Sequence, residues 1–155
     1  MTDVAKRFVS KRMVAVLNRM CVQLTGGMSA SRTNLRPGTS LGFVERIREN
    51  EFFGERLYPD VFHQAAAYMF HVIKDHVFLD GNKRTGLAAA VTLLEWNGVR
   101  LEPFDEESAY AFVIQVASGP NDPARALPRI AKWLEDQTRD VSRPDPRRGA
   151  PRPRG

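Results

Sequence analysis

Residues 76–84, His-Val-Phe-Leu-Asp-Gly-Asn-Lys-Arg, separate two long apolar patterns in this chain of 155 residues. Before them, residues 61–73 place apolar side chains at helical spacing on two adjoining stripes, which predicts a helix buried over a wide face. After them, residues 87–94 repeat the helical spacing, with alanines that permit close packing. The sequence therefore predicts a loop held between two buried helices, the second of which begins near Asn82.

The same helical periodicity extends over most of the remaining chain. It predicts further helices, with an irregular stretch between the second and the third that is suited to a small hairpin or flap. The helices are expected at about residues 9–20, 40–47, 105–119 and 130–134, and the hairpin or flap at about residues 46–54. The fold class is therefore all-α: a compact single domain of about six helices with a small flap.

The composition, 43% hydrophobic and 26% charged, is ordinary for a soluble protein. No apolar run approaches the roughly 20 residues that cross a bilayer, and the first residues lack the core of a signal peptide. The single cysteine, Cys21, cannot form an internal disulfide, and because it follows an apolar helical stripe we expect it to be a packing residue and not a nucleophile. We therefore expect a cytoplasmic protein with no membrane partner.

Most of the formal charge of +5 lies at the end of the chain. Residues 139–155 contain six arginines against two aspartates, together with four prolines and no aromatic residue. This composition predicts a disordered tail that follows a folded domain of residues 1–138. The nearly neutral domain does not predict a nucleic-acid interface, so such binding is expected only weakly, through the tail.

The polar residues of the loop favour the handling of a polyphosphate. Gly81 lets a ligand approach the backbone closely, and the positive end of the following helix attracts an anion. Lys83 and Arg84 add two cations that bind phosphate oxygens. Asp80 suits Mg²⁺, which typically uses one or two carboxylates together with substrate phosphates. His76 can accept the proton of an attacking hydroxyl, so the set as a whole predicts phosphoryl chemistry.

Each of these residues, taken singly, has a simpler explanation. A histidine before an apolar pair is often structural, Asp-Gly-Asn is a common turn, and Lys-Arg at the start of a helix is often only solvated. Their occurrence together within nine residues favours the phosphate site. The chain contains no P-loop and no protein-kinase signature, and His71 and His76 are five residues apart, which does not suit a zinc pair on one helix face.

Residues 76–86, which continue the loop with Thr-Gly, resemble the signature of the Fic/Doc superfamily in its death-on-curing (Doc) toxin form. The resemblance extends to other segments in the same order and covers about residues 4–135. These segments are Leu35-Arg36-Pro37-Gly38, Leu57-Tyr58-Pro59-Asp60, Asn97-Gly98 and Ile130-Ala131-Lys132-Trp133-Leu134.

The resemblance implies the toxin of a type II toxin–antitoxin system. Such a toxin transfers the terminal phosphate of ATP, with Mg²⁺, to a hydroxyl of a translation factor, and elongation factor Tu is the target in the family. His76 would be the general base, Asp80 the magnesium ligand and Phe78 the buried anchor of the loop. Residues 46–54 would be the flap that aligns a target segment by strand-like pairing. The phosphates would be held by Gly81, Asn82, Lys83 and Arg84, the last two also acting in catalysis.

Departures from the family pattern bear on the reaction. AMP-transferring members usually have a glycine where this chain has Lys83, and an arginine where it has Leu87. Doc-type toxins share the lysine, which favours a kinase and leaves AMP transfer to a protein hydroxyl as the alternative. Gly81 and Val77 also depart from common family residues, an alanine in some Doc proteins and a proline in many Fic enzymes.

A further departure concerns inhibition. Many Fic proteins carry a helix with the pattern Ser/Thr-x-x-x-Glu-Gly/Asn, whose glutamate blocks the nucleotide. Here Glu49-Asn50 is preceded at the required position by Glu45, not by serine or threonine. The sequence therefore predicts inhibition by a separate antitoxin in trans. A catalytically silent module that only binds an antitoxin is the remaining alternative.

Overall fold

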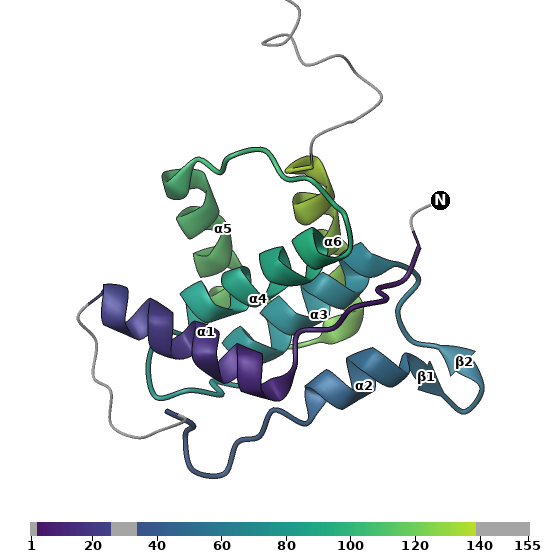
Figure 1. Ribbon diagram of the computed structural model, residues 1–155, viewed down its shortest axis with the longest axis horizontal. Helices are drawn as coiled ribbons and strands as arrows, with labels where there is room; N and C mark the ends of the chain where they lie inside the picture. Colours follow the sequence, from purple (N-terminus) through teal and green to yellow (C-terminus); the bar gives the residue numbers. More distant parts are fainter. Residues whose placement is uncertain (1–2, 26–33, 139–155) are drawn as a thin grey trace, which may run out of the picture.

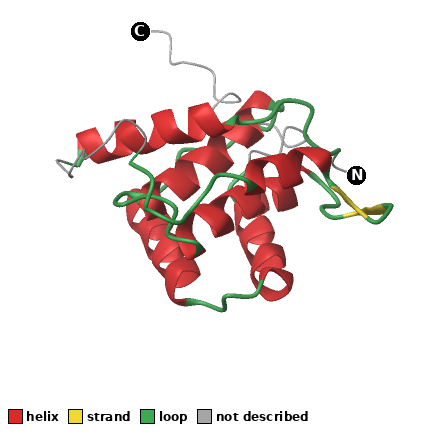
Figure 2. Cartoon of the chain, turned by 90° about the horizontal axis from the view of Figure 1, so that it is seen from below, coloured by secondary structure: helices red, strands yellow, loops and turns green. Residues whose placement is uncertain are grey.

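The computed structural model describes residues 3–25 and 34–138, and all structural statements concern these residues. They form six helices and one two-stranded antiparallel hairpin (Figures 1 and 2), which confirms the predicted all-α class with its small hairpin. The predicted tail at residues 139–155 lies outside the described residues. The elements are α1 (Lys11–Leu24), α2 (Phe43–Glu49), β1 (Glu51–Phe52), β2 (Glu55–Arg56), α3 (Val61–Lys74), α4 (Asn82–Trp96), α5 (Glu106–Ser118) and α6 (Pro123–Asp136).

Helix α3 lies at the centre of the molecule and packs against α4, α6, α2 and α5 (Figure 1). It is buried over nearly its whole length, as its two apolar stripes predicted. Helix α4 crosses it closely at Gly86, where an added Cβ would lie 2.9 Å from Ile73 Cγ1 and 3.1 Å from the Met69 carbonyl oxygen. This close crossing fixes where α4 begins relative to the end of α3. No helix among the described residues is long and apolar enough to cross a membrane.

The N-terminus of α4 differs from those of the other described helices. Serine or aspartate side chains cap α1, α3 and α6, and acidic residues occupy the first turns of α2 and α5. Helix α4 has Gly81, with a φ of 77°, as its N-cap residue, and it has neither a capping side chain nor an acidic residue in its first turn. Because the free N–H groups of a helix start attract anions, this end of α4 is open to an external anion.

The hairpin lies at the opposite end of α3 from the loop of residues 75–81 (Figure 1). Its two turn residues, Phe53 and Gly54, both have positive φ, 50° and 79°, as a type I′ turn requires. The 14 residues of α3 span about 20 Å at 1.5 Å per residue. The expected small hairpin is formed by residues 51–56, while residues 46–49 are the end of α2. The expected role of residues 46–54 in aligning a target segment stays a prediction.

Candidate functional site

The loop between α3 and α4 is held on one side by residues 34–36. Leu35 and Phe78 form an antiparallel bridge, in which the Arg36 amide donates to the Val77 carbonyl and the Leu79 amide donates to the Asn34 carbonyl, each at 2.9 Å. Among the described residues, strand-like pairing with the loop is thus made by residues 34–36. Val77 and Phe78 are fully buried, which confirms Phe78 as an apolar anchor.

The side chain of Asn82 closes the loop from within. Its Oδ1 accepts a hydrogen bond from the Phe78 amide and its Nδ2 donates to the Phe78 carbonyl, both at 2.9 Å. The predicted contact of Asn82 with phosphate stays a prediction. In the structure, the side-chain amide of Asn82 ties the first residue of α4 to the backbone of the buried Phe78.

Helix α1 supports the loop through the side chain of Asn18. The Nδ2 atom of Asn18 donates to the Asp80 carbonyl at 2.8 Å and to the Thr85 hydroxyl at 3.1 Å. Sequence analysis did not single out Asn18. The signal was present, because Asn18 lies between Val14 and Val22 at four-residue spacing, and these three are the fully buried positions of α1. A polar residue within a buried apolar stripe indicates a specific partner.

His76 follows the end of α3 in the left-handed conformation, with a φ of 47°. Its side chain is exposed and makes no hydrogen bond with the described part of the chain. The neighbouring His71 differs: it stacks on Phe43 and its Nδ1 lies 3.1 Å from Asp75 Oδ2. Burial lowers the pKa of His71, although its hydrogen bond with Asp75 acts to raise that pKa. Of these two histidines, His76 is the one whose ring is accessible to an acceptor hydroxyl.

Asp80 is the exposed carboxylate of the loop, and its Oδ1 accepts a hydrogen bond from the Gly81 amide at 2.8 Å. No group of three His, Cys, Asp or Glu side chains suited to a metal occurs in the described ranges. A lone carboxylate beside a phosphate site fits Mg²⁺, which takes its remaining ligands from substrate phosphates and water. Asp80 thus fits Mg²⁺ by its chemistry, and its role as a magnesium ligand stays a prediction.

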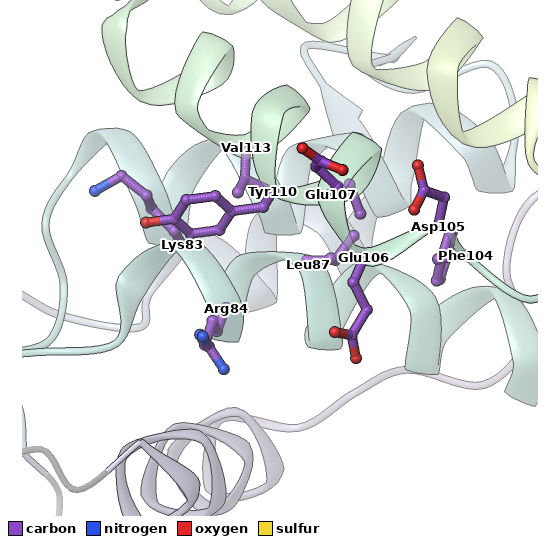
Figure 3. Close-up of a pocket in the computed structure, with 10 residues that line it drawn as sticks. Lys83, Arg84, Leu87, Phe104, Asp105, Glu106, Glu107, Tyr110 and Val113 are labelled. Atoms are coloured by element: carbon purple, nitrogen blue, oxygen red, sulfur yellow. The ribbon is translucent and has the colours of Figure 1, made fainter.

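A groove of about 650 Å³ leads away from the first turn of α4 toward α5. Figure 3 shows Lys83 and Arg84 at one end and the acidic residues 105–107 at the other, with Leu87 between Arg84 and Glu106. Lys83 and Arg84 are both exposed. The groove therefore combines a cationic end next to the loop, an apolar middle and an acidic rim. Its lining consists of Lys83, Arg84, Leu87, Phe104, Asp105, Glu106, Glu107, Ala109, Tyr110 and Val113.

Cys21 lies beside the site but has no feature of a nucleophile. It is partly buried, and burial raises the pKa of its thiol, although a hydrogen bond with Thr85 acts in the opposite direction. A thiol with a raised pKa is a poor nucleophile at neutral pH. This agrees with the sequence-based expectation that Cys21 is a packing residue.

A family model described as "Fic/DOC family" matches residues 8–94, more than half of the chain. The chain belongs to the Fic/Doc family. Its similarity to "Toxin Doc" of Mycolicibacterium smegmatis is 40% identity over 67 residues, or 43% of this chain and 52% of that protein, so the match spans about half of the relative's length. Its similarity to "Protein kinase doc" of Escherichia phage P1 is 26% identity over 113 residues, or 73% of this chain and 84% of that protein.

The family match covers α1, residues 34–36 and the whole loop, including every predicted site residue from His76 to Arg84. It ends within α4, so the α5 wall of the groove lies beyond it. The family assignment therefore applies to the loop and its supports, while the groove must be interpreted from its own residues.

Proposed function

We propose that this chain is the toxin of a toxin–antitoxin pair and transfers the terminal phosphate of ATP to a hydroxyl of a protein. One observation carries the proposal. A helix start without a cap or acidic residue is combined, within one supported loop, with an accessible imidazole, an exposed carboxylate and two exposed cations. Similarity to proteins named as a Doc toxin and a Doc protein kinase supports it.

In the proposed reaction, His76 takes the proton of the acceptor hydroxyl as its oxygen forms a bond to the γ-phosphorus. The bond from that phosphorus to the β–γ bridging oxygen breaks, and ADP leaves with the electron pair. Lys83, Arg84 and the free N–H groups of the first α4 turn bind the phosphate oxygens. Mg²⁺, held by Asp80 and the phosphates, would neutralise charge during transfer.

The groove favours phosphoryl transfer over AMP transfer. Leu87 lies one helical turn beyond Lys83 and presents an apolar side chain, which offers nothing to a second set of phosphate oxygens. We propose that the nucleoside lies over Leu87 and Tyr110, within a groove large enough for it. The phosphates then extend toward the loop, which brings the terminal phosphorus to His76. AMP transfer is the second candidate because it needs the same base and the same helix start.

The experiment is label transfer to elongation factor Tu, the proposed target. The chain is incubated with Mg²⁺, elongation factor Tu and ATP labelled at either the α- or the γ-phosphorus. We expect label in the protein from γ-labelled ATP only. AMP transfer releases the β- and γ-phosphates as pyrophosphate and therefore labels the protein from α-labelled ATP only. Label from both nucleotides would mean that both reactions occur, and the ratio of γ-label to α-label gives their proportion. Label from the α-position alone would overturn the kinase assignment.

The proposed partners are a separate antitoxin and a translation factor, in the cytoplasm. Helix α2 ends at Glu49, which Asn50 follows, and it lacks the serine or threonine of an inhibitory motif, which supports control in trans. If the protein arrests growth through its chemistry, His76→Ala removes toxicity in cells that lack the antitoxin. Equal toxicity of the variant and the unmodified chain would instead support a silent binding module.

A further inference from the structure

The side chain of Asn18 is a polar group in a fully buried position. Asn18 is 0% exposed and lies on the stripe of α1 that faces the protein interior. Leucine or valine would satisfy a requirement for packing alone at such a position. An amide there is tolerated when its hydrogen-bonding atoms find partners, so the identity of those partners indicates what the residue does.

Within the described part of the chain, the Asn18 side chain bonds to the site loop, to the first turn of α4 and to the segment paired with the loop. Nδ2 donates to the Asp80 carbonyl at 2.8 Å and to the Thr85 hydroxyl at 3.1 Å. Oδ1 accepts from Asn34 Nδ2 at 3.4 Å, and the Asn34 carbonyl in turn accepts from the Leu79 amide. The amide therefore joins α1 to residues 34–36, to the loop and to the first turn of α4.

The bond to the Asp80 carbonyl fixes the direction of the next amide group. The C=O of Asp80 and the N–H of Gly81 belong to one peptide unit, which is trans, so they point in opposite directions. With the carbonyl held against α1, the Gly81 N–H points away from α1, toward the exposed Asp80 carboxylate, to which it donates at 2.8 Å. That outer side is where phosphate and metal are proposed to bind.

The loop has little room to take another position. A Cβ at Gly81 would lie 3.1 Å from Val22 Cγ2 and 3.3 Å from Asn18 Nδ2, so α1 is in direct contact with this part of the loop. The Thr85 amide donates to the Gly81 carbonyl at 2.9 Å, which closes the first turn of α4 over the Asn18 amide. Asn18 thus bonds to both ends of the turn whose N–H groups face the anion.

We propose that Asn18 is a positioning residue for phosphate binding. It does not touch the substrate. It orients the Asp80–Gly81 peptide, whose N–H donates to the Asp80 carboxylate, and the start of α4, whose free N–H groups face the proposed phosphate site. This inference rests on the proposed function, because it assumes that phosphates bind at this helix start. It assigns to α1 a role that requires the amide, beyond the packing of its apolar residues.

The test compares Asn18→Leu with Gln64→Leu. Gln64 is the matched control because it is a buried amide, 1% exposed, that accepts from the Ala5 amide and donates to the Ile47 carbonyl, remote from the loop. Both variants lose buried hydrogen bonds and are expected to lower the melting temperature. We expect Asn18→Leu alone to lower kcat/KM for ATP by about 10- to 100-fold, as outer-shell substitutions do, and Gln64→Leu to change it by less than about threefold.

A second readout does not depend on transfer. Affinity for ATP and for inorganic tripolyphosphate, measured by calorimetry, is expected to fall in Asn18→Leu and to be retained in Gln64→Leu. Amide hydrogen exchange at Leu79 and Thr85 is expected to accelerate in Asn18→Leu. If Asn18→Leu does not fold, Asn18→Ser, whose hydroxyl is too short to reach the Asp80 carbonyl, is measured against the same criteria.

Equal losses in the two variants, or full affinity and activity in Asn18→Leu, would overturn the positioning role. The proposed function can fail separately. If the unmodified chain binds tripolyphosphate but transfers no phosphate to a protein, the kinase assignment falls, and Asn18 is judged on affinity alone: a loss confined to Asn18→Leu supports the inference, and unchanged affinity contradicts it.

Discussion

The turns at the two ends of α3 are closed in the same way, by an asparagine side chain bonded to both backbone groups of one residue, yet only one of the ends is suited to chemistry. At the hairpin end, the Asn50 amide accepts from the Tyr58 N–H at 2.6 Å and donates to the Tyr58 carbonyl at 3.0 Å. At the loop end, the Asn82 amide bonds both backbone groups of Phe78 in the same way. Each end also contains left-handed residues, Phe53 and Gly54 in one and His76 and Gly81 in the other.

The two ends differ in whether the helix start that follows the turn is capped, and in which segments pack against the turn. The hairpin projects Phe52 and Phe53 into solvent, 61% and 91% exposed, and leads into an α3 start that Asp60 caps. The loop end leads into a helix start with no cap, flanked by two cations, and is supported by α1 and by residues 34–36. The asparagine hydrogen bonds therefore stabilise the turn at both ends of α3. Only the loop end also has an uncapped helix start with supporting segments, which makes it suited to chemistry.

The largest difference between the two ends should come from their histidines. His76 follows α3 and is proposed as the base; His63, in the first turn of α3, bonds Asp60 at 2.9 Å. We expect His76→Ala to lower kcat for phosphate transfer by roughly 10²–10⁴-fold, the usual contribution of a general base. His63→Ala should leave kcat within about twofold, because surface substitutions rarely act at a distance. A similar loss in both variants would remove the functional distinction between the ends.

The paired asparagines sharpen the comparison. Asn50→Ala and Asn82→Ala each remove two hydrogen bonds to backbone groups, and each should lower the free energy of unfolding by about 1–3 kcal/mol, measured by urea denaturation. Only Asn82→Ala should also lower transfer, by about tenfold or more, because it releases the loop next to the phosphates. Retention of full activity in a destabilised Asn82→Ala would show that the loop does not need this closure.

The substitution Leu87→Arg tests what the groove selects. A guanidinium one turn beyond Lys83 would give a polyphosphate a second site along the groove and so weaken the preference for the proposed orientation. We expect the ratio of γ-label to α-label transferred to a protein to fall several-fold, roughly 1 kcal/mol in relative transition-state binding. Leu87→Met is the size-matched control and should leave the ratio unchanged. An unchanged ratio in Leu87→Arg would contradict the assignment of the groove to the nucleoside.

The smallest effect is expected at the hairpin tip. Phe53 has a φ of 50° before Gly54, and asparagine is the residue that a type I′ turn prefers at this position. Phe53→Asn should raise the free energy of unfolding by about 0.5–1 kcal/mol, since asparagine adopts the left-handed region more easily. Transfer activity should not change. Loss of activity would instead place this tip in target binding, as sequence analysis first expected for residues 46–54.

The sequence predicted the elements better than the contacts between them. The periodicity of residues 61–73 and 87–94 correctly indicated two buried helices. The chemistry inferred from the residue types of the loop stays a prediction. The hairpin was expected at about residues 46–54, whereas residues 46–49 belong to α2 and the strands lie within residues 51–56, because sequence patterns place element boundaries only to within a few residues. Asn18 was missed, because its bond to the Asp80 carbonyl spans 62 residues. For Asn82, the residue type was consistent with phosphate binding, while its backbone partners at Phe78 emerge only from the fold.

The most direct test of a phosphoryl-transfer site at the loop end of α3 is the intact mass of elongation factor Tu after incubation with the chain, ATP and Mg²⁺. We expect the mass to increase by one phosphate, and no increase to occur with His76→Ala. An increase by one AMP, or an equal increase with His76→Ala, would contradict it.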